Sequence, residues 1–158
     1  MPSDAVLHQA AALCLTYPDE DLVARLPLLR EAAPQLRGFT DHAAVTPRRE
    51  LAAHYERVFG AGHRHGLYLS RWPAGGAPRR PAPDGLADLY RRHGLECDGQ
   101  PPDFLPAVLE YTARTGDTGV LTGYRDGLER LRARLAEDGT PYAGVLDAVC
   151  ATLPAASG

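Results

Sequence analysis

The sequence predicts an all-α protein, a single-domain bundle of about seven helices over residues 1–158. Apolar residues recur every three or four positions along most of the chain, which is the period of a helix with one buried face. No segment alternates apolar and polar residues as a half-buried strand does. Capping residues and prolines divide the pattern into separate segments. A chain of this length can bury one sizeable core.

The first two helices are predicted from their end signals. Ser3 or Asp4 can cap a first helix, and Pro18 should end it. Asp19 can cap the second helix, which Pro27 should kink or divide because proline has no N–H to donate. The apolar positions fit one face on each helix: Val6, Leu7, Ala10, Ala11, Leu13, Cys14 and Tyr17, then Leu22, Val23, Leu26 and Leu29.

A third helix should follow Thr46 and Pro47, which together form a helix-start signal, and should end before Gly60. Its inward face would be Leu51, Tyr55, Val58 and Phe59. Residues 72–83 are rich in Gly, Pro and Arg, so we expect a flexible surface loop there.

Two helices are expected between residues 84 and 115. Asp84 can cap one that ends near Gly94. Asp103 is the predicted N-cap of the next, and Pro106 lies in its first turn, where a missing N–H costs nothing. The apolar positions are Leu86, Leu89 and Tyr90, then Leu105, Val108, Leu109 and Thr112.

The last two helices should cover residues 118–137 and the segment after Thr140 and Pro141. Gly119, Gly123 and Gly127 weaken the first of these by roughly 1 kcal/mol each relative to alanine. The inward positions are Leu121, Tyr124, Leu128, Leu131 and Leu135, then Tyr142, Val145, Leu146 and Val149.

Composition argues against several classes of protein. A net charge of −3 gives no electrostatic reason to expect nucleic acid as a partner. Cys14, Cys97 and Cys150 are widely spaced, which favours free thiols in a reducing compartment. We find neither a signal-peptide pattern nor an apolar run long enough to cross a bilayer. We therefore expect a soluble cytoplasmic protein.

Signals of catalysis and metal binding are weak. His63 and His65 form the only close histidine pair, without the further ligands that a closed metal site needs, so a solvated loop is favoured. His8, His42 and His93 look like isolated surface or boundary histidines. There is no phosphate-binding loop and no serine flanked by elbow glycines. We expect no metal and no catalysis.

Two motifs carry a family resemblance. A helix ending in Tyr55 and Phe59 precedes residues 66–70, Gly-Leu-Tyr-Leu-Ser. Residues 100–106, Gln-Pro-Pro-Asp-Phe-Leu-Pro, then run on to Leu-Glu-Tyr at 109–111. In these motifs the chain resembles the NarJ type of redox-enzyme maturation chaperone, also called the nitrate reductase delta subunit. The resemblance covers roughly residues 50–112.

The resemblance implies a role as a chaperone. Such proteins bind the N-terminal segment, a remnant of a twin-arginine export signal, of the catalytic subunit of respiratory nitrate reductase. They hold the apo-subunit until molybdenum cofactor insertion is complete and prevent its premature attachment to the membrane subunit. The resemblance implies no stably bound cofactor, since the client carries the molybdenum cofactor and iron–sulfur clusters. We expect a monomer or weak dimer, with no nucleic-acid partner and no membrane insertion.

A groove for an amphipathic peptide is the predicted site. Its candidate peptide-binding residues are Tyr55, Phe59, Leu67, Tyr68, Leu69, Trp72, Asp103, Phe104, Glu110 and Tyr111. For Phe59 and Leu67 a core role is the favoured interpretation, and Asp103 is most simply an N-cap. Glu110 could meet a basic peptide.

The chain departs from the family pattern at two places, which leaves the client open. Gly60 stands where relatives usually have aspartate, and residues 75–81 keep two arginines but lose the acid of a Gly-Asp-x-Arg-x-Arg-Gly-like segment. The alternatives are a chaperone for an enzyme of the dimethyl-sulfoxide or trimethylamine-oxide reductase type, or a helical protein–protein adaptor.

Overall fold

The computed structural model describes residues 4–60, 67, 83–95 and 104–153. All regular structure within these ranges is helical, which confirms the all-α prediction. The elements are α1 (Asp4–Cys14), α2 (Glu20–Ala32), the 3-10 helix η1 (Pro34–Leu36), α3 (Arg37–Ala44), α4 (Arg48–Phe59), α5 (Pro83–Arg92), α6 (Leu105–Thr115), α7 (Gly119–Gly123), α8 (Arg125–Glu137) and α9 (Tyr142–Ala151). The loop predicted at 72–83 lies outside these ranges except for Pro83, which begins α5.

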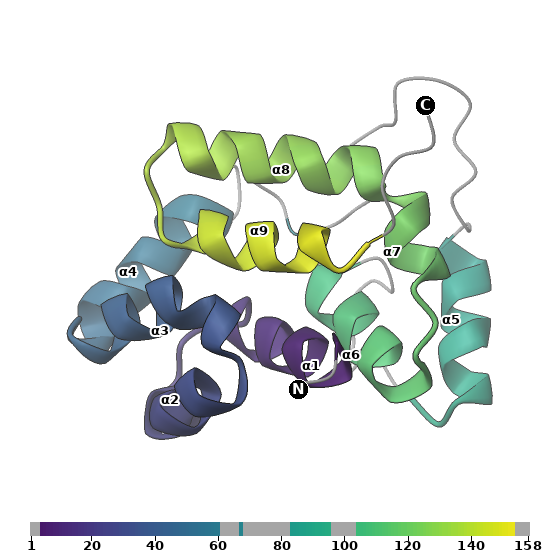
Figure 1. The fold of residues 1–158 in the computed structure, drawn as a ribbon, viewed down its shortest axis with the longest axis horizontal. Coiled ribbons are helices and arrows are strands. Elements are labelled where there is room, and N and C mark those ends of the chain that lie inside the picture. The colour runs from purple at the N-terminus through teal and green to yellow at the C-terminus, as the bar shows by residue number, and fades with distance from the viewer. Residues whose placement is uncertain (1–3, 61–66, 68–82, 96–103, 154–158) are drawn as a thin grey trace.

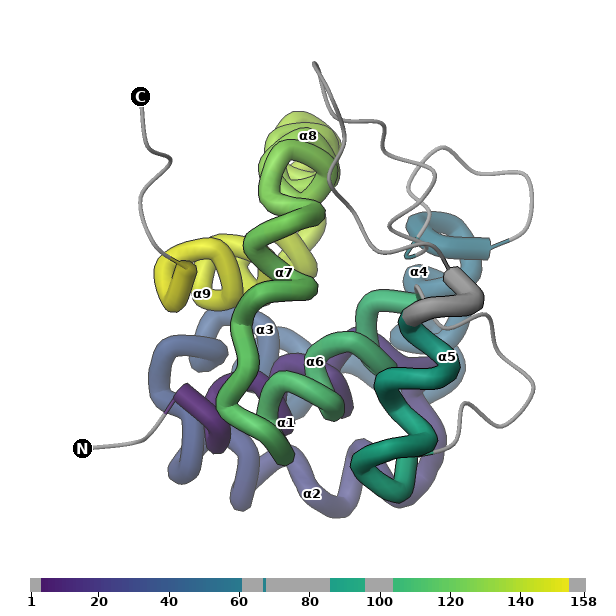
Figure 2. Tube along the Cα trace, turned by 90° about the vertical axis from the view of Figure 1, so that its right-hand side faces the viewer, coloured from purple at the N-terminus to yellow at the C-terminus, as the bar shows by residue number. Residues whose placement is uncertain are grey.

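The helices pack in pairs that are distant in sequence. Figure 1 shows α8 and α9 side by side along one edge, with α1 and α6 paired beneath them. Figure 2, turned by 90°, shows α6 between α1 and α5, with α2 at the base of the molecule. Because α1 is the most extensive partner of α6, the first helix of the chain is part of the central core. This core includes Ala11, Cys14, Leu109, Val145 and Leu146, all fully buried.

The start of α2 forms as predicted. The Asp19 carboxylate accepts a hydrogen bond from the Leu22 N–H at 2.8 Å, an N-cap contact that satisfies one of the first-turn donors. Pro27, however, does not divide the helix, which continues to Ala32. Val23, whose carbonyl would otherwise accept the missing N–H, is exposed, as is Pro27. Solvent can therefore replace the lost hydrogen bond.

The first helix ends earlier than predicted, at Cys14 rather than before Pro18. The Thr16 hydroxyl donates to the Leu13 carbonyl at 2.7 Å, which satisfies a carbonyl that a longer helix would have used. Tyr17, predicted to face inward, is 49% exposed because it lies beyond this end.

Thr46 does not cap α4, as the sequence had suggested. Its hydroxyl donates to the His42 carbonyl at 2.6 Å, and Pro47 takes the N-cap position without a side-chain hydrogen bond. The Thr46 hydroxyl is therefore used at the C-terminal end of α3, a helix that the sequence did not predict. The signal for α3 was present, since Leu36, Phe39 and Ala43 are buried at helical spacing.

The predicted helix at 118–137 is two helices, α7 and α8, with the break at Tyr124. The backbone of Tyr124 leaves helical geometry at φ −103° and ψ 15°. Gly123, which precedes the break, stabilises a continuous helix poorly. Tyr124 is only 3% exposed, so the break accompanies burial of a large aromatic side chain.

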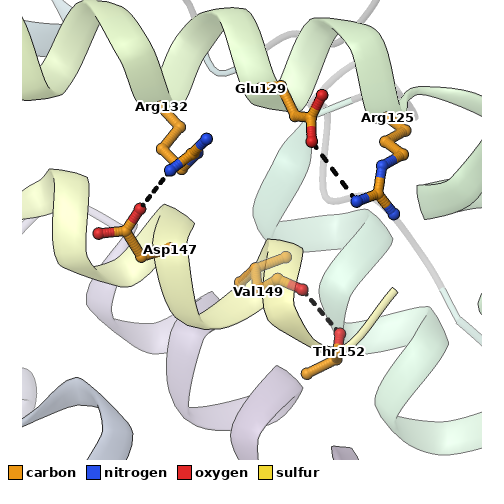
Figure 3. A network of polar contacts seen from close by, with 6 residues as sticks. All are labelled: Arg125, Glu129, Arg132, Asp147, Val149 and Thr152. Carbon is orange, nitrogen blue, oxygen red and sulfur yellow. Dashed lines mark hydrogen bonds and ion pairs between the residues drawn. The ribbon is translucent and has the colours of Figure 1, made fainter. Parts of the chain in front are cut away.

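Polar contacts join α9 to its neighbours (Figure 3). Arg132 on α8 pairs with Asp147 on α9 at 3.0 Å, an exposed pair that should contribute little stability.

The Thr152 hydroxyl, just after the end of α9, donates to the Val149 carbonyl at 2.7 Å. Since that proton is used, the 2.9 Å contact between His8 Nε2 and Thr152 Oγ1 requires His8 to donate. His8 is 2% exposed, which corrects its prediction as a surface or boundary histidine.

Stability should fall as the pH is lowered through the histidine range. Burial lowers the pKa of His8 from 6.5, an effect that Asp4 partly offsets. Burial, and after it Arg57 and His42, lower the pKa of His54 from the same value. As the pH falls, these histidines are protonated in the unfolded chain before they are protonated in the folded protein. The stability that is present above about pH 6.5 is therefore lost as the pH falls below it. We expect a lower thermal midpoint at about pH 5.5 than at about pH 7.5.

The control is the double variant His8→Gln/His54→Gln, whose midpoint should depend less on pH over that interval. An equal dependence in the variant would show that other groups cause the effect.

Candidate functional site

The predicted site residues separate into two regions of the structure. Tyr68, Leu69, Trp72 and Asp103 lie outside the described residues. Tyr55 and Phe59 lie on α4, whereas Leu67, Phe104, Glu110 and Tyr111 lie at or near α6. In Figure 1, α4 lies at the left edge of the molecule and α6 lies nearer its centre.

Tyr55 and Phe59 belong to an aromatic cluster around Tyr142 of α9. The Phe59 and Tyr142 ring centroids are 4.9 Å apart, and those of Tyr55 and Tyr142 are 6.2 Å apart, both in edge-to-face geometry. The ring centroid of Phe39, on α3, also lies 4.9 Å from that of Tyr142. The Tyr55 hydroxyl donates to the Leu15 carbonyl at 3.2 Å. Both α4 residues are half-buried, so they join α4 to α9 while keeping part of each ring accessible.

His54 completes this aromatic cluster. Its ring stacks on Tyr142 with an interplanar angle of 8°, and its Nε2 lies 2.7 Å from the Thr140 hydroxyl. Tyr142 is fully buried, and its hydroxyl finds no hydrogen-bond partner among the described residues. Burial raises the pKa of this phenol, which therefore stays neutral. The cluster is a packing junction, and we find no acid–base pair in it.

Residues around the start of α6 supply partners for its first N–H groups. Phe104 takes the N-cap position, without a side-chain hydrogen bond. Asp103, the predicted cap, lies outside the described residues. The first N–H groups already have partners: Leu105 donates to the Leu67 carbonyl at 2.7 Å, and Val108 donates to the Phe104 carbonyl. Pro106 has no N–H, as predicted. The described contacts thus satisfy the Leu105 and Val108 donors at the start of this helix.

Glu110 and Tyr111 are neighbours in sequence but face different environments. Tyr111 is 1% exposed, and its ring centroid lies 5.4 Å from that of Tyr90. Its hydroxyl donates a hydrogen bond to the Asp117 carboxylate at 2.9 Å. Its pKa is raised, first by burial and then by Asp117. Glu110 is half-exposed and forms an ion pair with Arg114 at 3.4 Å. Of these two predicted residues, only Glu110 is accessible to a partner.

An apolar groove that the sequence did not predict lies between α1, α2 and α6. It has a volume of about 360 Å³ and is formed by residues between 5 and 13 of α1, residues between 28 and 32 of α2, and Ala113 with Arg114 of α6. We call it the α1–α2–α6 groove. Val6 and Leu28 line it, at 39% and 65% exposure. Leu28 lies off the buried face formed by Leu22, Leu26 and Leu29, which is the sequence signal that could have identified it.

Neither a metal centre nor a membrane span is found in the described part of the chain. No three His, Cys, Asp or Glu side chains there gather as metal ligands would. His63 and His65 lie outside that part. Cys14 and Cys150 are buried free thiols, as their helix positions predicted, and burial raises the pKa of Cys14 to about 12. No described helix is both long and apolar enough to cross a membrane.

The fold and these regions define a class, an all-α helical bundle with an apolar groove open to solvent. The sequence matches the nitrate reductase delta subunit family over residues 24–148. The chain therefore belongs to this family, and the resemblance found from its motifs is confirmed.

Individual relatives agree with this assignment. The nitrate reductase-like protein NarX of Mycobacterium tuberculosis H37Rv is 32% identical, over 93% of this chain and 24% of NarX. NarW of Escherichia coli K12, which is named as a nitrate reductase molybdenum cofactor assembly chaperone, is 30% identical over 87% of this chain and 63% of NarW. The chain thus spans less than two thirds of either relative.

A solved structure has the same fold. The crystal structure of a redox enzyme maturation protein from Archaeoglobus fulgidus superposes with a TM-score of 0.75, covering 96% of this chain and 94% of that chain. At 21% identity this similarity concerns the fold alone.

Proposed function

We propose that this protein is a maturation chaperone for the catalytic subunit of respiratory nitrate reductase. It would bind the N-terminal leader segment of the apo-subunit, support molybdenum cofactor insertion and prevent premature assembly at the membrane. The observation that carries the proposal is family membership over residues 24–148, together with the assembly-chaperone name of NarW.

The accessible chemistry of the molecule supports binding rather than catalysis. Half-buried aromatic rings on α4 and the α1–α2–α6 groove offer apolar area, which is the main source of affinity for an amphipathic peptide. In this proposal the chaperone acts in the cytoplasm, without a cofactor of its own and without catalysis. The molybdenum cofactor and iron–sulfur clusters belong to the client.

A second client class is suggested by two departures of the sequence from the family pattern. The segment at 75–81 keeps Arg79 and Arg80 but lacks the acid that relatives carry, and Gly60 replaces their usual aspartate. A reductase of the dimethyl-sulfoxide or trimethylamine-oxide type therefore stays an alternative client.

The test is calorimetric titration of a synthetic peptide with the N-terminal sequence of the nitrate reductase catalytic subunit. We expect the wild type to bind it, and Tyr68→Ala or Leu69→Ala to weaken binding by about tenfold or more, because large apolar side chains dominate such interfaces. Circular dichroism should show unchanged helix content in both variants.

Different outcomes separate the possibilities. Unchanged affinity in both folded variants would place the site elsewhere. Preference for a leader from the other reductase type would identify that alternative client. A wild-type protein that binds no leader peptide would favour the helical adaptor and contradict the chaperone proposal.

A further inference from the structure

His54 joins α4 to the start of α9 through two contacts. Its ring stacks on that of Tyr142, the first residue of α9, with the centroids 5.6 Å apart. Its Nε2 lies 2.7 Å from the Oγ1 of Thr140, two residues before that helix. Both partners are distant from His54 in sequence, so the two contacts hold α4 in place against α9.

The helix that carries His54 has a limited number of other anchors. Figure 1 shows α4 at the left edge of the molecule. None of the extensively packed helix pairs in the described part of the chain includes α4, whereas α1 with α6 and α8 with α9 are such pairs. Of the residues of α4, Leu51 and Val58 are the buried ones. A change at His54 therefore acts on a helix that the rest of the bundle holds less firmly.

The Thr140 hydroxyl distinguishes the two protonation states of His54. Its oxygen accepts from the Tyr142 N–H at 3.3 Å, and its proton is left for His54 Nε2. A neutral imidazole can accept this proton at Nε2, whereas a protonated imidazole is a donor at both nitrogens. Thr140 is 6% exposed, and its hydrogen bonds within the described residues give the proton no other acceptor. Protonation of His54 therefore leaves a buried donor without a partner, which costs free energy.

The groups that face His54 also oppose a positive charge on its ring. His42 of α3 lies with its ring centroid 6.2 Å from that of His54, and Arg57 lies on α4 itself. From α9 the facing group is the Tyr142 phenol, which stays neutral. No carboxylate in the described ranges raises the pKa of His54. Burial, and after it Arg57 and His42, hold this pKa below 6.5.

We propose that His54 is a pH-sensitive latch between α4 and α9. Neutral His54 holds α4 against the start of α9, and protonated His54 lets α4 open while the rest of the bundle stays folded. Opening separates Tyr55 and Phe59 from Tyr142, so both half-buried rings gain exposure. The inference goes beyond the proposed function and concerns the protein without its client, so the failure of either leaves the other standing.

Hydrogen–deuterium exchange followed by mass spectrometry tests the latch, with each rate divided by the intrinsic exchange rate at the same pH. In the wild type, we expect the protection of α4 amides to fall by up to about tenfold between about pH 7.5 and about pH 5.5. The reason is that pH 5.5 lies about one unit below the ordinary histidine pKa of about 6.5, which His54 regains when α4 opens. Amides of α6 should stay better protected than those of α4 at both pH values, because α6 lies in the core.

Three variants separate the latch from a general effect of acid, and circular dichroism checks that each one folds. His54→Gln has no titratable group, so its α4 protection should not depend on pH. His8→Gln is the matched control: His8 contacts Thr152 and not α4, so α4 should respond to pH as in the wild type. Thr140→Val removes the hydroxyl that holds neutral His54, so α4 protection should be reduced already at about pH 7.5.

Two results would overturn the latch. One is equal pH dependence of α4 protection in the wild type and His54→Gln. The other is equal protection of α4 and α6 at about pH 5.5, which would mean that α4 opens only with the whole protein. An NMR titration of the wild-type His54 ring needs no variant and should give a midpoint below about 6.5. A midpoint at or above that value would also contradict the proposal.

Discussion

Tyr142→Ala is expected to destabilise the protein by about 3–5 kcal/mol, the usual cost of removing a large buried aromatic side chain. Tyr142 is fully buried, and Phe39, His54, Tyr55 and Phe59 surround its ring. The truncation would leave a cavity where α3, α4 and α9 meet, and the neighbouring rings could not fill it without losing their own contacts. Urea denaturation followed by circular dichroism measures the effect as a lower transition midpoint.

Tyr142→Phe is the matched control. The phenol oxygen has no hydrogen-bond partner in the described part of the chain, so removing it should not destabilise the protein. A buried hydroxyl without a partner costs about 1–3 kcal/mol, and the phenylalanine variant could recover part of that. A loss of more than about 1 kcal/mol in Tyr142→Phe would mean that the hydroxyl has a partner after all.

Local signals predicted most helices because their causes are local. Asp19 caps α2 through a donor three residues away, and Pro106 occupies a first turn whose N–H is not needed. Contacts between residues that are distant in sequence could not be predicted in this way. The Leu67 carbonyl, far away in sequence, accepts from the Leu105 N–H at the start of α6. No local pattern reveals such a partner.

A similar limit applies to α3 and α4. Thr46 satisfies the rule for a helix start, yet its hydroxyl serves the helix before it. Few of the eight residues of α3 are apolar, and Gly38 lowers the helix propensity of the segment. Packing of Phe39 against Tyr142 stabilises a helix that propensity alone would not.

The candidate site was only partly predictable for the same reason. Sequence reasoning selected Glu110 and Tyr111 together, but adjacent residues on a helix lie about 100° apart, so one is buried and the other accessible. The α1–α2–α6 groove requires three helices that are distant in sequence to meet. Leu28 could be recognised as an apolar residue off the buried face of its helix, but its neighbours across the groove could not.

The second large effect concerns recognition of the client. In our account the chaperone distinguishes the apo-subunit by its N-terminal segment. A catalytic subunit that lacks this segment should therefore be retained about tenfold less well or worse, even when the rest of its sequence is intact. The subunit should be produced in cells that cannot make the molybdenum cofactor, so that both forms stay in the apo state.

The most direct measurement of this claim is co-purification of the affinity-tagged chaperone with either form of the client, quantified by mass spectrometry. We predict stoichiometric retention of the full-length apo-subunit and loss of the N-terminally truncated form. Equal retention of the two forms would show that recognition lies in the folded body of the client, and would contradict a leader-binding chaperone.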